Sequence, residues 1–161
     1  MSKEKLYIFD TTLRDGAQTE GVDFSVEDKN KIAKILSNIG VDYIEGGWPG
    51  ANPIDNEFFD KSPNLGNSKF TAFGMTKKNG VSADNDPNLS PLMNANCKTV
   101  CVVGKTWDFH VRTALGIKNE DNLKNELLII LTEELQKELS SEVYPERLDF
   151  LFETINTQGS F

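Results

Sequence analysis

The stretch at residues 8–21, which reads IFDTTLRDGAQTEG, is the feature that most constrains the fold of this chain. It grows out of an apolar run at residues 6–9, whose β-branched and aromatic side chains predict a short buried strand. The run stops at Asp10, a dense polar loop follows, and hydrophobic residues resume at helical spacing after Ser25. A strand that leads through a polar loop into a helix predicts an α/β protein, in which sites lie just beyond the carboxyl ends of the strands.

Two charged residues in this loop indicate a binding site. The guanidinium of Arg14 stands next to the carboxylate of Asp15, and together they can hold a hard metal ion and an anionic substrate. The alternative is that Asp-Thr-Thr and Arg-Asp-Gly are ordinary turns with a surface ion pair. Turns of this kind explain an isolated Arg-Asp-Gly well, whereas the whole stretch favours a site.

The middle of the chain repeats the alternation of helix and strand. Ser25 is a plausible N-cap, apolar residues then recur near helical spacing, and Gly40 ends the helix. A short helix capped by Asn52 or Asp55 and a weak helix at residues 89–95 fall between the later strands. We therefore predict four parallel strands that lie side by side in chain order, with helices on the outer face. The predicted strands are at residues 5–9, 42–46, 69–73 and 99–103.

Length and composition exclude several classes of protein. A chain of 161 residues can bury one ordinary core. The formal net charge of −8 argues against a nucleic-acid partner held by phosphate contacts. No apolar run approaches the roughly 20 residues of a membrane span. The N-terminal MSKEK lacks the apolar core of a secretory signal, so we expect a cytoplasmic protein. We place Cys97 and Cys101 in one strand as core thiols, because their spacing disfavours a disulfide.

The polar loop and three later segments resemble a known family. The string DTTLRDGxQ, intact at residues 10–18, resembles the signature of TIM-barrel metal enzymes that condense or cleave acyl-CoA compounds. This family includes isopropylmalate synthase, homocitrate synthase, citramalate synthase and hydroxymethylglutaryl-CoA lyase. Three further strings, IEGGWPGANPxD, AFGMT and WDFHV, resemble the citramalate synthase branch.

The resemblance implies an α/β fold of the TIM-barrel type. A complete barrel typically needs about 250 residues, so residues 1–125 would be its amino-terminal half, with about four βα units. Residues 126–161 no longer resemble the family, and we expect a divergent helical tail that is not a separate domain. Its apolar spacing predicts one helix at residues 122–139 and a second at residues 145–155.

The resemblance also implies a reaction. It would be the metal-dependent Claisen condensation of acetyl-CoA with a 2-keto acid, pyruvate favoured, in branched-chain amino-acid biosynthesis. The metal would be Mg²⁺, Mn²⁺ or Zn²⁺. A sibling activity is the first alternative: isopropylmalate synthase, homocitrate synthase or the lyase. The second alternative belongs to another class, a non-catalytic half-barrel that binds a partner chain.

The resemblance implies roles for six residues at or just beyond the ends of the predicted strands. In the implied mechanism, Asp15 is a metal ligand and Arg14 stabilises the oxyanion that develops on the keto oxygen. Glu45 joins the acid/base relay or lines the pocket. The remaining three residues would contact substrate: Gln18 would orient it, and Phe73 and Thr76 would line the keto-acid pocket.

The ligand set that the family needs is incomplete in this sequence. The family completes its metal site with a His-x-His pair and an Asn from later strands, whereas His110 is the only histidine here and is more typical of a structural residue. We therefore expect the chain to be a truncated form that is inactive alone. A half-barrel exposes sheet edges and apolar surface, so we also expect a homo-oligomer or dependence on a partner.

Overall fold

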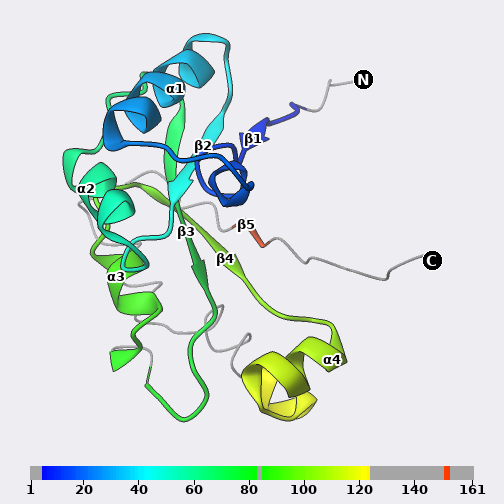
Figure 1. The fold of residues 1–161 in the computed structure, drawn as a ribbon. Helices are drawn as coiled ribbons and strands as arrows, with labels where there is room; N and C mark the ends of the chain where they lie inside the picture. The colour runs from blue at the N-terminus through cyan, green and yellow to red at the C-terminus, as the bar shows by residue number, and fades with distance from the viewer. Residues whose placement is uncertain (1–4, 83–84, 124–150, 153–161) are drawn as a thin grey trace, which may run out of the picture.

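The structure, a computed structural model, describes residues 5–82, 85–123 and 151–152 of the chain (Figure 1). Its centre is a sheet in which each strand pairs in parallel with the next along the chain. The prediction of four parallel strands in chain order is confirmed. The strands are β1 (Phe9–Asp10), β2 (Tyr43–Gly47), β3 (Lys69–Met75), β4 (Thr99–Val103) and β5 (Leu151–Phe152).

Three helices cover one face of this sheet. They are α1 (Val26–Asn38), α2 (Pro53–Lys61) and α3 (Leu89–Met93), and Figure 1 shows them on the same side of the strands. The hydrophobic core lies between the two layers. Phe58 and Phe59 from α2 pack against Phe70 from β3, with ring centroids 5.1 and 4.6 Å from it. After β4 the chain forms a helical turn, α4 (Asp108–His110), which continues into a π-helical turn at Val111–Leu115.

The helix boundaries follow the capping residues that the sequence suggested. Ser25 and Asp28 form a capping box at the start of α1, and Gly40 ends that helix with a φ of 91°. Asn52 caps α2, where its side chain accepts a hydrogen bond from the backbone N–H of Asp55. Local side-chain chemistry therefore fixes the ends of both helices that pack on β2.

The first strand is shorter and more exposed than predicted. Only Phe9 and Asp10 pair with β2, and Leu6, Tyr7 and Ile8 are 88%, 59% and 59% exposed. These residues are exposed because β1 lies at an edge of the sheet, where it pairs with β2 alone among the described strands. The prediction of a buried strand at residues 6–9 is therefore wrong for its first three residues.

β2 and β3 run further than predicted, because glycines near their ends belong to the strands. A Cβ on Gly46 would lie 2.3 Å from the ring of Phe70, and one on Gly74 would lie 2.2 Å from Leu92. Gly46 thus permits the close approach of Phe70 from the neighbouring strand, and Gly74 that of Leu92 from α3; neither glycine stops its strand. Glu45 and Phe73 lie inside these strands, as the predicted ranges 42–46 and 69–73 had them.

Two further expectations need correction. Cys97 lies before β4, where its thiol donates to the carbonyl of Thr99 at 3.4 Å, while Cys101 is in the strand and buried. Residues 151 and 152 form β5, paired with Cys101 and Val102, and are not part of a helix at 145–155. The open edge of β4 offers backbone partners that compete with the helical spacing of this segment.

Most of the predicted tail lies outside the described residues. Residues 119–123 are helical, in keeping with the start of the helix expected at 122–139, and the rest of that helix is not described. Among the described residues, no helix is long and apolar enough to cross a membrane.

Candidate active site

The loop after β1 is a tight turn built on one carbonyl group. The backbone N–H groups of Arg14, Asp15 and Gly16 all donate to the carbonyl of Thr11, at 3.1, 2.8 and 3.2 Å. The side chain of Leu13 is fully buried in the core and anchors the turn. The polar loop thus has one defined conformation, with Arg14 and Asp15 at the carboxyl end of β1.

Arg14 is the centre of a charged cluster. Its Nε donates to Glu45 Oε2 at 2.7 Å, and its Nη1 donates to Asp15 Oδ1 at 3.0 Å. The Glu45 side chain is fully buried and that of Arg14 is 14% exposed. A buried carboxylate needs a counter-charge and hydrogen bonds, and Arg14 supplies both to Glu45. The cluster therefore holds a guanidinium in a fixed orientation at the edge of the sheet.

Two aromatic side chains form an apolar surface beside this guanidinium. The Arg14 Cζ atom lies 4.1 Å from the centroid of the Phe73 ring, which is a favourable cation–π distance. The ring of Trp48 meets Phe73 edge to face at 5.5 Å. Ile44 belongs to the core on the helix side of the sheet, so its neighbour Glu45 faces the opposite side. The cluster thus lies on the face of the sheet away from α1 and α2.

The other predicted site residues have different surroundings. Asp15 has a side chain that is 63% exposed, as suits a group that meets solvent or a ligand. Thr76 is buried at the end of β3, where its N–H donates to the carbonyl of Val103 at 3.3 Å and its carbonyl accepts from Asn88 at 3.2 Å. The structure therefore brings together Arg14, Asp15, Glu45 and Phe73. Thr76 is tied to the neighbouring strand and loop.

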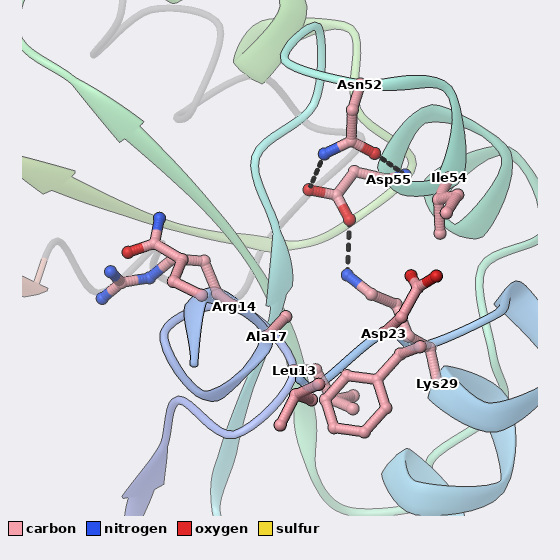
Figure 2. Close-up of a pocket in the computed structure, with 11 residues that line it drawn as sticks. Leu13, Arg14, Ala17, Asp23, Lys29, Asn52, Ile54 and Asp55 are labelled. Atoms are coloured by element: carbon pink, nitrogen blue, oxygen red, sulfur yellow. Dashed lines mark hydrogen bonds and ion pairs between the residues drawn. The ribbon is translucent and has the colours of Figure 1, made fainter. Parts of the chain in front are cut away.

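A cavity of about 290 Å³ lies between the loop after β1 and the start of α2. Gln18 and Arg14 line it on one side, and Lys29 and Asp55 line it on the other. Figure 2 shows the Arg14 side chain pointing away from the Lys29–Asp55 ion pair. Gln18 and Arg14 thus both contribute to the wall of this cavity.

The sequence did not identify Lys29, Asp55 or Trp48 as site residues. Lys29 belongs to an otherwise amphipathic helix, where charged residues normally face solvent. One signal was present, since Asp55 was a candidate cap and the glycines at 46 and 47 suggested a close backbone approach. The sequence places Trp48 only in a loop that Pro49 closes.

The described residues do not make a metal site by themselves. They contain no group of three or more histidine, cysteine, aspartate or glutamate side chains that could hold an ion. Asp15 offers one exposed carboxylate, and one of its oxygens already accepts from Arg14. His110 is in α4, where its ring packs edge to face on Trp107 at 4.5 Å. The carboxylate of Asp15 alone therefore falls short of the three protein ligands typical of a catalytic Zn²⁺ site.

Comparison with known proteins gives citramalate synthases and isopropylmalate synthases. The chain is 49% identical over 142 residues to the (R)-citramalate synthase of Aquifex aeolicus, which covers 87% of this chain and 26% of that protein. It is 52% identical over 126 residues to the (R)-citramalate synthase of Geobacter sulfurreducens, covering 77% and 24%. It is 36% identical over 124 residues to 2-isopropylmalate synthase 1 of Caldanaerobacter subterraneus, covering 77% and 30%. The chain thus spans about a quarter of the length of the citramalate synthases that it matches.

The fold comparison and the family comparison agree with these relatives. The crystal structure of hydroxymethylglutaryl-CoA lyase from Pseudomonas aeruginosa superposes with a TM-score of 0.62 at 20% identity, covering 83% of this chain and 43% of that one. This likeness shows the fold, which is that of the amino-terminal part of an α/β barrel. Residues 5–140 match the HMGL-like family, and the chain belongs to that family.

Proposed function

We propose that this chain is the amino-terminal part of a citramalate synthase-like enzyme, which condenses acetyl-CoA with a 2-keto acid, pyruvate favoured. The observation that carries the proposal is the Arg14 guanidinium, held 2.7 Å from buried Glu45 and over the Phe73 ring at the carboxyl edge of the sheet. The identity of 49% and 52% to two (R)-citramalate synthases supports the choice of reaction. In this proposal, residues 1–125 are the barrel portion and residues 126–161 are a divergent tail.

The proposed role of Arg14 follows from its geometry. In the condensation, a base removes a methyl proton from acetyl-CoA, and the resulting enolate attacks the keto carbon of the acceptor. Negative charge then develops on the keto oxygen, where a fixed cation stabilises the transition state. This oxygen takes up a proton, and water hydrolyses the thioester, which releases free CoA. Within the described residues, two of the five N–H donors of Arg14 are engaged by Glu45 and Asp15. The others can bind the keto oxygen and the carboxylate of the acceptor.

The proposed role of Glu45 is to hold this cation in place. Its carboxylate fixes the Arg14 side chain from a fully buried position, and it can join the acid/base relay once acetyl-CoA is bound. Phe73 and Trp48 would exclude water beside the acceptor. A small apolar surface of this kind suits the methyl group of pyruvate.

A divalent metal ion, Mg²⁺, Mn²⁺ or Zn²⁺, would act in the complete enzyme as a Lewis acid on the keto acid. We assign Asp15 as one of its ligands. The described residues supply too few ligands for the ion, so the remaining ligands would have to come from elsewhere. The proposed roles of Arg14 and Glu45 do not depend on the metal.

The alternative with specific support is 2-isopropylmalate synthase, since a relative with that name is 36% identical. Pyruvate and 2-ketoisovalerate separate the two activities, because they differ only in the size of the apolar group beside the keto carbon. We expect the purified chain to bind pyruvate weakly and to bind 2-ketoisovalerate more weakly still. Saturation-transfer NMR on the methyl protons of the two keto acids measures both affinities.

The test variant is Arg14→Ala, which should abolish the transfer signal under conditions in which urea denaturation shows it to be folded. The control variant is Lys31→Ala, which should leave the signal unchanged. Lys31 is an exposed lysine of α1 that pairs with Glu27 and does not line the cavity, so its loss removes a positive charge without changing the proposed site. Tighter binding of 2-ketoisovalerate would move the assignment to isopropylmalate synthase. A signal that persists in Arg14→Ala would remove Arg14 from the site.

A further inference from the structure

Lys29 and Asp55 form a buried ion pair that the proposed chemistry does not use. Lys29 is in the first turns of α1 and is 4% exposed, and Asp55 is in the first turn of α2 and is 7% exposed. Removing two charges from water is costly, and a pair of apolar residues often gives equal or greater stability. Stability alone therefore does not account for the pair, and its contacts indicate a positional role.

The hydrogen bonds of the pair to the backbone converge on two residues at or just after the end of β2, Gly46 and Trp48. Lys29 Nζ donates to the carbonyl of Gly46 at 2.9 Å and also contacts Asp55 Oδ1. Asp55 Oδ2 accepts from the backbone N–H of Trp48 at 2.9 Å. A side-chain amide, Asn52 Nδ2, donates to the same carboxylate oxygen at 3.0 Å, and Figure 2 shows the three side chains together. The pair thus holds the backbone that directly follows Glu45.

Gly47, between these two tethers, has a conformation that only glycine adopts easily. Its φ is 150°, and a Cβ there would lie 2.5 to 2.6 Å from three atoms of the Asp55 carboxylate group. The pairing of β2 with β3 also shifts register between Glu45 and Gly47. The carboxylate therefore occupies the space that a side chain would need, and it holds an irregular strand end in place.

Two residues at the ends of this held segment, Glu45 and Trp48, belong to the candidate active site. Glu45, immediately before it, bonds Arg14, and Trp48, at its end, packs on Phe73. Lys29 and Asp55 come from the helix layer, whereas the Arg14 cluster lies on the opposite face of the sheet. The pair also lines the cavity that Arg14 lines, but its hydrogen bonds to the strand are made to the backbone of residues 46–48.

We propose that Lys29 and Asp55 are positioning residues: they fix the end of β2 so that Glu45 meets Arg14 and Trp48 packs on Phe73. The part of this inference that concerns keto-acid binding rests on the proposed function. The part that concerns the position of Trp48 does not. The two parts can therefore be tested separately in the same protein.

The test replaces both charges by apolar groups, in the variant Lys29→Met/Asp55→Leu. A Trp107→Phe background leaves Trp48 as the single tryptophan, because the chain has two. The matched control is Glu27→Leu/Lys31→Met, which removes an ion pair of the same helix whose side chains are 76% and 65% exposed. Three quantities are measured: unfolding in urea, acrylamide quenching of Trp48 fluorescence, and pyruvate binding by NMR.

We expect the double variant to unfold cooperatively, which shows that it is folded. Trp48 should become about twofold more accessible to acrylamide, and pyruvate affinity should fall about 10-fold, a loss typical of residues that support a site from behind. The control should change neither quantity. A folded double variant with wild-type quenching would overturn the inference. If the wild-type chain binds no pyruvate, the proposed function fails while the quenching result still decides the positional role.

A second variant covers the case in which the double variant does not fold. Asp55→Asn keeps an oxygen acceptor for the Trp48 N–H but removes the charge that pairs with Lys29. We expect it to fold with reduced stability and with Trp48 quenching raised above wild type. Reduced stability with unchanged Trp48 quenching would assign the pair a purely structural role and refute the proposal.

Discussion

Arg14 and Glu45 depend on each other at the scale of single residues. Glu45 is fully buried, and the Nε of Arg14 lies 2.7 Å from its carboxylate. Removing one partner of such a pair leaves a buried charge, which typically costs about 3–5 kcal/mol. We expect Arg14→Ala to lower the free energy of unfolding by about that amount in urea denaturation at pH 7. Arg14→Ala/Glu45→Gln should recover most of the loss, and a double variant as unstable as the single one would contradict this account.

Cys97 gives a prediction about pH. Burial raises the pKa of its thiol to about 11, against weaker effects of backbone hydrogen bonds that lower it. The thiolate is the reactive form, so at pH 8 we expect iodoacetamide to modify Cys97 on the order of 100-fold more slowly in the folded chain than in denaturant. Mass spectrometry of the Cys97 peptide measures both rates, and equal rates would contradict the assigned burial.

The sign of the effect of Cys97 on stability follows from the same shift. The unfolded thiol ionises at a lower pH than the folded one, so the contribution of Cys97 to stability is fully present below pH 9. It is lost as the pH rises through about 11. Cys97→Ala should reduce this alkaline loss of stability.

The sequence predicts the cluster of Arg14, Asp15 and Glu45 but not the ion pair of Lys29 and Asp55. Arg14 and Asp15 are in a contiguous motif, and Glu45 lies near the end of the next strand, so the parallel order of β1 and β2 sufficed to predict their meeting. Lys29 and Asp55 are far apart in the chain and are on two helices. Their contact depends on how those helices pack, and helical spacing does not specify that.

At the scale of elements, the start of α1 couples helix stability to pH. Hydrogen bonds from the side chain and backbone of Ser25 lower the pKa of Asp28. A carboxylate with a lowered pKa stabilises the folded state above its unfolded pKa, and this contribution disappears as the pH falls through the folded value. We expect Ser25→Ala to raise the pKa of Asp28 toward its ordinary value in an NMR titration. Glu27→Gln, in the same turn, should leave it low, and an unchanged value in Ser25→Ala would exclude the capping box as the cause.

The same scale shows which elements were predictable. α1 and α2 have clear caps, and β4 is a continuous apolar run, so their positions agreed with the sequence. β1 was overestimated because apolar composition does not reveal whether a strand lies at an edge. β2 and β3 end one and two residues later than the sequence predicts, at Gly47 and Met75. Gly74 does not stop β3, because the side chain of Leu92 fills the space beside it.

At the scale of the whole molecule, apolar side chains remain exposed along one side. Leu6, Tyr7 and Ile8 precede the edge strand β1, and Ile39 at the end of α1 is 73% exposed. The carbonyl of Ile8 accepts from Asp42 and Tyr43, a few residues beyond Ile39, so these groups are near one another. Exposed apolar groups beside a sheet edge favour association. This supports the expectation that the chain forms a homo-oligomer or depends on a partner.

The last prediction is that the chain alone does not turn over acetyl-CoA and pyruvate. In the proposed reaction a metal ion would be held by several protein ligands, whereas the described residues contain no group of three or more side chains that could hold one, and Asp15 is the ligand that we assign. A metal held by one carboxylate and water is weakly bound and poorly oriented. Arg14 and Glu45 cannot replace the lost Lewis acid. We therefore expect no release of free CoA above background with Mg²⁺, Mn²⁺ or Zn²⁺.

The control for that assay is Asp15→Ala, which should give the same background as the wild-type chain. The opposite result would mean that a complete metal site forms. Turnover of roughly 1 per second or faster that Asp15→Ala abolishes would show that Asp15 acts in a complete metal site. The other ligands would then come from a second polypeptide or from residues 124–161. Dilution separates these sources, because a site shared between chains loses specific activity as the protein concentration falls, whereas a site within one chain keeps it.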